Sequence, residues 1–514
     1  MILAVGFGLS IVKAQSADNG PILTISNGKL QGTVDSSGVR SFKGIPFAQP
    51  PVGNLRWKEP QPPKNWVGIR PADHFGPQPM QRKMYNDMYS RSNGKSEDCL
   101  YLNVWTPAKS STEKLPVLVY FYGGGFMAGD GSEYRYDGAS LAKQGIVTVT
   151  INYRLGIFGL LALPELTQES AHHSAGNYGL MDQHAALLWV RKNIAAFGGD
   201  PDKVTIGGES AGAMSVCAQM ASPLSKGLFR GAIAESGSML GNLSPQPLVE
   251  AEEDGLKFQK AIGKTSLAEL RNIPADQLLQ LSASFHFPTA IDGYFLPETP
   301  QAIFSTGRQM DVPFLAGWNS AEVDYHSLLG KDEPNLANYK DTLQKIYGNR
   351  AGEVLKLYPA ASDQDVAQVA TQLAADRFIA YATWKFIDLH SKTDGYPVYR
   401  YLFSRKRPQK ANTDTTKMPH LFGAVHASEI AYALGNLKYD NDHAWTADDY
   451  KVSQTMQNYF ANFIKTGDPN GDGLPKWFGL QSSVPKVMVI DVDSHSEPEK
   501  NLKRYVLLDS FYNP

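Results

Sequence analysis

Cysteine is scarce in this chain, with two residues among 514. So few cysteines provide no disulfide framework, and the fold has to be held by a buried apolar core. Hydrophobic residues make up 42% of the sequence, which is enough for a large core. No linker, internal repeat or low-complexity tract divides the chain, and strand and helix patterns alternate through its first half. We therefore expect one large α/β domain with long insertions over residues 20–514.

An excess of charge of either sign is also missing. The 49 lysines and arginines nearly balance the 51 aspartates and glutamates, for a net charge of −2. Proteins that bind nucleic acid or an anionic membrane surface usually carry a marked basic excess. We expect no nucleic-acid partner and no stable membrane insertion.

The apolar run at the N-terminus, residues 1–12, is too short to span a bilayer. Small residues suited to cleavage follow it, in Lys13-Ala14-Gln15-Ser16-Ala17. Residues 1–16 therefore resemble a secretory signal, although the basic residues that usually open such a signal are absent. This predicts a periplasmic or secreted protein. The alternative is an ordinary N-terminal strand or helix.

A glycine-rich turn surrounds Ser210 in the sequence Gly208-Glu-Ser-Ala-Gly212. A strand-like segment, 203–206, precedes this turn, and residues 213–220 have the pattern of a helix. Small residues permit a tight strand-to-helix turn that lifts a serine hydroxyl out of the backbone. The start of the helix would then face negative charge built near that hydroxyl. Alone, the pattern also fits a glycine-rich turn with a surface serine.

A second glycine-rich segment, residues 122–129, follows the apolar strand pattern of 117–121. Three consecutive glycines, 123–125, allow backbone N–H groups to approach a substrate without obstruction, as an oxyanion hole requires. A flexible connector or a phosphate-binding loop is the alternative. The signatures of nucleotide-binding loops are absent, since no Gly-Lys-Ser/Thr follows and the G-x-G-x-x-G spacing is missing. Together, the two segments predict an acyl-transfer site.

A serine nucleophile needs a base and an acid, and in this kind of fold the acid and then the histidine follow the serine. His426 lies late in the chain among small residues, and His420 is its competitor. Glu322 and Asp324 both follow the buried strand pattern of 312–316, at the strand end where α/β sheets place their chemistry. The residue types alone do not choose between these two acids.

Further motifs extend from about residue 25 to residue 477. They are Phe42–Ala48, Pro51–Trp57, Glu97–Trp105, Asn152–Gly159, Gly198–Pro201 and Gly207–Gly212. With these motifs the chain resembles the type-B carboxylesterase/lipase family, the branch of the α/β-hydrolases that also contains the cholinesterases. The resemblance implies an α/β-hydrolase fold, in which helices flank a large, mostly parallel, twisted central sheet with long insertions.

The resemblance also implies the roles of the site residues. Ser210 would be the nucleophile, His426 the base and Glu322 the acid. The family pattern Gly-x-Asn-x-x-Glu falls on Gly317–Glu322 and favours Glu322 over Asp324. By the same resemblance, the oxyanion donors would be Gly124, Gly125 and Ala211, and Glu209, Ser236 and Glu429 would surround the catalytic triad. No metal or organic cofactor is implied.

The predicted substrate is a small-molecule ester, with a short-chain acyl group or an aryl or alkyl alcohol, hydrolysed by a monomer. Residues 282–293 resemble the family's acyl-pocket segment, which makes Phe285 and Phe287 candidate walls. Tyr325 and His326 follow the acid and are candidates to face the same pocket. Each of the four also fits an ordinary packing role.

The chain departs from the family in two places. Many members pair the signature cysteine, here Cys99, with an earlier one, but Pro79 stands at that earlier position. Cys99 is therefore expected to be unpaired, and Cys217 to pack in the core. Residues 80–95 contain no tryptophan of the kind that stacks on quaternary ammonium groups, which argues against a dedicated cholinesterase.

Two rival functions remain open. An interfacial lipase would need a mobile apolar lid, but the candidate segment, residues 78–95, is polar. A non-catalytic binding relative would have a broken triad, whereas Ser210, Glu322 and His426 are all present. We therefore favour hydrolysis of soluble esters.

Overall fold

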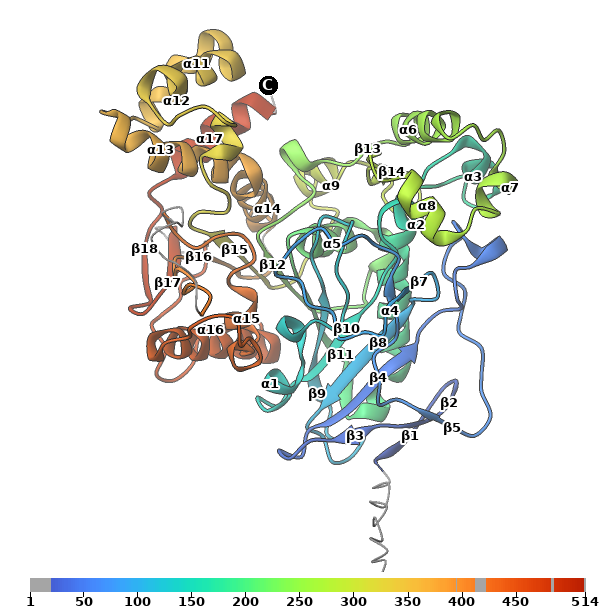
Figure 1. Ribbon diagram of the computed structural model, residues 1–514. Coiled ribbons are helices and arrows are strands. Elements are labelled where there is room, and N and C mark those ends of the chain that lie inside the picture. The colour runs from blue at the N-terminus through green and yellow to red at the C-terminus, as the bar shows by residue number, and fades with distance from the viewer. Residues whose placement is uncertain (1–19, 394, 412–421, 482–484, 513–514) are drawn as a thin grey trace, which may run out of the picture.

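Figure 1 shows the computed structural model, which describes residues 20–393, 395–411, 422–481 and 485–512. The predicted signal segment, residues 1–16, and the competing histidine, His420, lie outside the described residues. Among the described residues, no helix combines the length and the apolar character needed to cross a bilayer.

An 11-stranded sheet forms the centre of the molecule, in the order β18-β17-β16-β15-β12-β11-β9-β10-β8-β4-β3. Its neighbours from β17 to β10 are all parallel, and the outer pairs are antiparallel. The strands are β3 (Thr33–Val34), β4 (Arg40–Pro46), β8 (Tyr101–Thr106), β9 (Leu115–Phe121), β10 (Val147–Ile151), β11 (Gly199–Glu209), β12 (Gly231–Glu235), β15 (Phe314–Asn319), β16 (Val398–Phe403), β17 (Lys486–Ile490) and β18 (His495–Pro498). The prediction of a large, mostly parallel sheet is confirmed.

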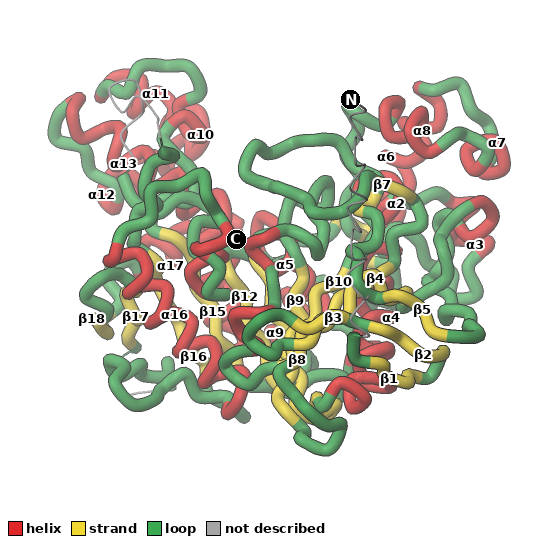
Figure 2. The backbone as a smooth tube through the Cα atoms, turned by 60° about the horizontal axis from the view of Figure 1, so that its bottom comes forward, coloured by secondary structure: helices red, strands yellow, loops and turns green. Residues whose placement is uncertain are grey.

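A three-stranded sheet, β1-β2-β5, lies beside the β3–β4 edge in both views (Figures 1 and 2). Its strands are β1 (Ile22–Ile25), β2 (Gly28–Gln31) and β5 (Ile69–Pro71). Four further two-residue strands form two pairs, β6 (Gln78–Pro79) with β7 (Lys95–Ser96) and β13 (Gln246–Pro247) with β14 (Ala290–Ile291). Residues 80–94 lie between β6 and β7, which pair with each other, and we call them the covering segment.

Helices flank the central sheet (Figure 1). Those nearest to it are α1 (Ala139–Ala142), α4 (Tyr178–Asn193), α5 (Ala211–Ala221), α9 (Pro300–Ser305), α14 (Tyr381–Ser391), α15 (Ile430–Ala433) and α16 (Ala447–Thr466), and the short helices α2 (Gly156–Leu160) and α3 (Pro164–Glu169) follow β10. α5 packs on β11 and β12, and α14 packs on β15 and β16. The fully buried strand residues, such as Val119 and Ile206, follow from this two-sided cover.

Two helical groups lie apart from each other, at the upper left and the upper right of both views (Figures 1 and 2). One consists of α6 (Leu248–Ala261), α7 (Leu267–Arg271) and α8 (Ala275–Leu281), and the other of α10 (His326–Leu329), α11 (Leu336–Tyr347), α12 (Ala351–Leu357) and α13 (Asp363–Ala375). The second group has an apolar cluster of its own, against which α17 (Leu502–Tyr512) packs through Leu507 and Phe511. These groups are the long insertions that the sequence predicts.

Local patterns locate the strands that carry the site, with errors at their ends. The pattern of 117–121 corresponds to β9, and that of 203–206 to the inner part of β11. The pattern of 312–316 begins too early, because β15 starts at Phe314, after Pro313. Proline has no N–H for the ladder, so a central strand starts beyond it. Both cysteines are free and buried, which confirms the prediction that Cys99 is unpaired.

Candidate active site

Ser210 stands at the turn between β11 and α5. Its backbone has φ 57° and ψ −121°, a strained conformation for a residue with a side chain. The turn is possible because two glycines let the backbone approach itself closely. A Cβ at Gly208 would lie 2.6 Å from the carbonyl carbon of Gly212, and one at Gly212 would overlap the carbonyl oxygen of Phe121. The glycines therefore hold the serine in this conformation.

Replacing Gly212 by alanine is expected to destabilise the protein by about 1–3 kcal/mol, because the new methyl group has to displace the backbone of β9. Gly352→Ala is the matched control, since a Cβ there meets no atom within 4 Å and the residue lies in α12. The control is expected to keep or raise stability by up to about 1 kcal/mol. The thermal midpoints of the two variants test this, and equal midpoints would contradict it.

His426 connects the serine to an acidic residue. Its Nε2 lies 2.9 Å from Ser210 Oγ, and its Nδ1 lies 2.7 Å from Glu322 Oε2. The backbone N–H of His426 also donates to the carbonyl oxygen of Glu322, at 3.1 Å. The three side chains come from the carboxyl ends of β11 and β15 and from the chain after β16. These strands are parallel, so they deliver the side chains to the same end of the sheet.

The Glu322 carboxylate is buried and held in place by donors. Its Oε1 accepts from the backbone N–H of Asn319 and from the Ser236 hydroxyl, both at 2.6 Å. Glu429 lies behind them, with one oxygen 3.4 Å from the Ser236 hydroxyl and the other accepting from the Asn319 side chain at 2.5 Å. These contacts leave Oε2 directed at His426.

Asp324, the acid that the residue types left open, lies elsewhere. Its side chain is half exposed and contacts His326 at 3.2 Å. This carboxylate is in water and lies beside a different histidine. In the described structure, Glu322 is the acid that faces His426.

A second carboxylate, that of Glu209, lies beside the imidazole of His426. Its Oε1 lies 3.2 Å from His426 Nε2. Burial raises the pKa of Glu209 above the ordinary range. Burial also lowers the pKa of His426, but the charge of Glu209 and the hydrogen bond that His426 donates to Glu322 outweigh it, so the pKa of His426 lies above its ordinary value. The imidazolium form of His426 is therefore stabilised.

A cavity of about 480 Å³ opens onto these groups. It is lined by Tyr85, Asp87, Met88, Gly124, Gly125, Arg135, Glu209, Ser210, Ala211, Met214, Leu243, Val323, Phe378, Ile379, His426 and Ala427. Gly124 and Gly125 have φ values of 116° and 64°, which favour glycine. With Ala211, at the start of α5, they bring backbone next to Ser210 on the same cavity wall.

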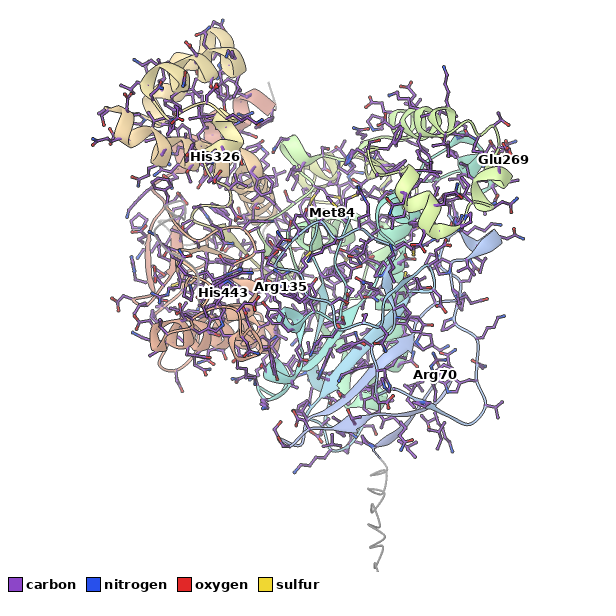
Figure 3. The ribbon with its side chains drawn as sticks, in the orientation of Figure 1. Arg70, Met84, Arg135, Glu269, His326 and His443 are labelled. Carbon is purple, nitrogen blue, oxygen red and sulfur yellow. The ribbon has the colours of Figure 1, made fainter. Side chains whose placement is uncertain are left out.

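The four predicted pocket residues are not among the described residues that line this cavity. Phe285 and Phe287 instead pack edge-on against Phe258 of α6, with ring centroids 5.1 and 5.6 Å apart. Tyr325 packs on the cluster of the α10–α13 group, and His326 lies at that group in Figure 3. Aromatic residues at these positions are used for packing the insertions.

Several lining residues were missed by the sequence reasoning. Phe378 and Ile379 lie on a π-helical turn, Asp376–Ala380, where Phe378 contacts the His426 ring edge-on at 5.2 Å. Arg135 lies on a short 3₁₀ turn, Tyr134–Tyr136. No local motif marks these residues. The π-helical turn inside a longer helix is a feature often found at functional sites, but it is visible only in the backbone.

Solved structures share this architecture. A structure described as PNB esterase superposes with a TM-score of 0.81 at 31% identity, covering 96% of this chain and 99% of that one. The Geobacillus stearothermophilus carboxylesterase at pH 6.2 gives a TM-score of 0.81 at 32% identity, covering 95% and 99% of the two chains. The α/β-hydrolase fold is thereby confirmed.

Sequence comparison agrees with the structural one. Para-nitrobenzyl esterase of Bacillus subtilis (strain 168) is 34% identical over 509 residues, covering 94% of this chain and 98% of the relative. Fumonisin B1 esterase of Sphingopyxis macrogoltabida is 34% identical over 489 residues, covering 91% and 86%. The profile of the Carboxylesterase family matches residues 19–506. The chain belongs to the carboxylesterase family and is a hydrolase of carboxylic esters.

Proposed function

We propose that Ser210 attacks the ester carbonyl and carries the acyl group, with His426 as base and Glu322 as its orienting acid. The observation that supports this most directly is the continuous contact from Ser210 Oγ to His426 Nε2, at 2.9 Å, and from His426 Nδ1 to Glu322, at 2.7 Å. In this arrangement the imidazole accepts the serine proton and then gives it to the leaving alcohol. Water repeats the cycle on the acyl-enzyme and releases the acid.

The oxyanion formed in each step is proposed to accept hydrogen bonds from backbone N–H groups of Gly124, Gly125 and Ala211. Their position beside Ser210 on the cavity wall supports this role. Donors fixed by the backbone need no reorganisation as charge develops, and each contributes about 3–4 kcal/mol to the transition state. Ser236, Glu209 and Glu429 are proposed to position the triad through the contacts described above.

Glu209→Gln is expected to shift the acid limb of the kcat/KM profile to lower pH. The reaction needs neutral His426, so activity rises as pH increases through the pKa of that histidine. The Glu209 charge raises this pKa, and removing it lowers the pKa. The same change also removes stabilisation from the imidazolium, so kcat is expected to fall by about tenfold or more. Rate profiles from pH 5 to pH 11 test the sign, because the pKa of His426 is raised to about 10, and a shift of the limb to higher pH would contradict it.

The proposed substrates are small esters with short acyl groups or aryl or alkyl alcohols. The largely apolar cavity wall, with Met88, Leu243 and Phe378, supports this class. The relative named para-nitrobenzyl esterase supports an aryl-containing ester. The substrates are expected to be small molecules, because the cavity has a volume of about 480 Å³ and is lined by the covering segment and by the turn at Phe378.

A series of 4-nitrophenyl esters from acetate to palmitate tests this range. We expect the highest kcat/KM at acetate to butyrate, with a fall of about tenfold or more by palmitate, since a cavity of limited length loses affinity for longer chains. A rise toward palmitate, with activation above the solubility limit of the ester, would favour the interfacial lipase. The covering segment would then have to act as a lid.

We also propose that the protein is exported and acts as a monomer. The support for export is the sequence of residues 1–16 alone. Mass spectrometry of the mature N-terminus tests it, with a start near residue 15 expected, and sedimentation of the same material gives the oligomeric state. A retained N-terminal segment would contradict export by cleavage.

A further inference from the structure

Two charged residues that line the active-site cavity, Arg135 and Asp87, have no part in the proposed reaction. Arg135 lines the cavity, and its side chain is only 4% exposed. It lies below Met84 of the covering segment in Figure 3. Burying a guanidinium is costly unless its N–H groups find acceptors. The hydrogen bonds of this residue are therefore informative.

The guanidinium is incompletely paired. Its Nη2 donates to Glu133 Oε2 at 2.9 Å, and its Nη1 lies 3.4 Å from Asp87 Oδ2. Its Nε is buried and has no hydrogen-bond partner among the described residues. An arginine side chain carries five N–H donors, so these two contacts leave several without an acceptor. A buried cation with spare donors at a cavity wall can bind an anion.

The two acidic neighbours neutralise Arg135 only in part. Burial raises the pKa of Glu133 to about 7, while the charge of Arg135 and its hydrogen bond oppose this shift. Asp87 belongs to the covering segment, its side chain is 41% exposed, and its contact is long. Asp87 can rotate into water, because its own side chain is partly exposed and its contact with Arg135 is long.

Apart from Arg135 and Asp87, the charged groups that line the cavity are Glu209 and His426, beside the nucleophile. Glu209 faces His426 Nε2, and the charge of Arg135 is among the causes that lower the pKa of Glu209. The charge of Arg135 therefore acts on the residue next to Ser210. Most of the remaining wall is apolar, with Met214, Val323 and Ile379. In such surroundings a charged contact is stronger than it would be in water.

We propose that Arg135 is a specificity residue that binds a free carboxylate of the substrate, so that the enzyme favours esters carrying a second, unesterified carboxyl group. This rests on the proposed function of Ser210. The substrate carboxylate takes the place of the Asp87 carboxylate and accepts from the guanidinium in a bidentate manner. Half-esters of dicarboxylic acids and esters of carboxylated phenols both belong to this class.

Matched substrate pairs test the proposal. On the acyl side, mono(4-nitrophenyl) glutarate is compared with 4-nitrophenyl pentanoate. On the alcohol side, 4-acetoxybenzoate is compared with 4-acetoxybenzamide. The quantity measured is the ratio of kcat/KM for the anionic ester to kcat/KM for its neutral partner. A misfolded fraction cancels from this ratio, because both substrates report on the same enzyme sample.

Arg135→Met is expected to lower the ratio by about tenfold or more for at least one pair, since a hydrogen-bonded contact to a charged group is lost. Asp87→Asn is expected to raise the ratio by about threefold, because the competing carboxylate is gone. Lys83→Met is the matched control. It removes a positive charge from the exposed part of the same covering segment, outside the cavity lining, and should leave the ratio unchanged.

A ratio that Arg135→Met leaves unchanged for both pairs would overturn the proposal. So would an effect of Lys83→Met as large as that of Arg135→Met, which would indicate a general effect of charge. If Arg135→Met does not fold, the proposal is tested by Asp87→Asn alone. A ratio that falls or stays unchanged in Asp87→Asn then overturns the proposal. Failure of the proposed function is recognised separately, because Ser210→Ala would then retain turnover of the neutral esters.

Discussion

Ser210→Ala is expected to lower kcat for 4-nitrophenyl butyrate by about 10⁵- to 10⁶-fold. The variant keeps the cavity, the glycine-rich wall and the His426–Glu322 pair, but it has no oxygen that can form the acyl-enzyme. Residual turnover then comes only from binding and oxyanion contacts. Substrate affinity is expected to change little, since a methyl group fits where the hydroxymethyl group was.

Ser222→Ala is the control for this variant. Ser222 follows α5, and its buried hydroxyl has no hydrogen-bond partner among the described residues, so its loss should leave kcat within about twofold. Labelling with a fluorophosphonate, followed by mass spectrometry, gives an independent measurement. Wild type and Ser222→Ala should take up one phosphonyl group on the peptide containing Ser210. Turnover or labelling that persists in Ser210→Ala would contradict the assigned nucleophile.

Glu322→Gln is expected to lower kcat by about 10³- to 10⁴-fold while the protein keeps its fold. The reason lies in the two donors at Glu322 Oε1, the backbone N–H of Asn319 and the hydroxyl of Ser236. They require an oxygen at that position, so the glutamine NH₂ has to face His426 Nδ1. This amide donates to Nδ1 and stabilises the tautomer with the proton on Nε2. That tautomer cannot accept the proton of Ser210.

Asp324→Asn is the matched control, since it neutralises the other acid of the same segment. Its half-exposed carboxylate contacts His326 and not His426, so kcat should stay within about twofold. Single-turnover kinetics of the two variants separate acylation from substrate binding. A larger loss in Asp324→Asn than in Glu322→Gln would contradict the assigned acid. Glu322→Asp keeps the charge but shortens the side chain, so its kcat should lie between those of Glu322→Gln and Asp324→Asn.

Local sequence patterns determined the parts of the protein that are built within one segment. The apolar run of residues 117–121 predicts the strand that is β9, because buried parallel strands are apolar on both faces, and the strand-like segment 203–206 lies within β11. Gly208 and Gly212 predict the turn at Ser210 because only residues without a Cβ fit that close approach. Family motifs then indicated the fold and the ester chemistry, and both are confirmed by the comparisons.

Only the tertiary structure decided which side chains meet. Residue types alone did not separate Glu322 from Asp324. In the structure, the Glu322 carboxylate is buried against His426, whereas the Asp324 carboxylate lies in water. Phe285 and Phe287 were expected at the cavity but pack on α6. A local pattern reports the backbone of its own segment. A cavity wall is assembled from segments far apart in the chain, such as those of Arg135 and Phe378, and their meeting is fixed by packing between elements.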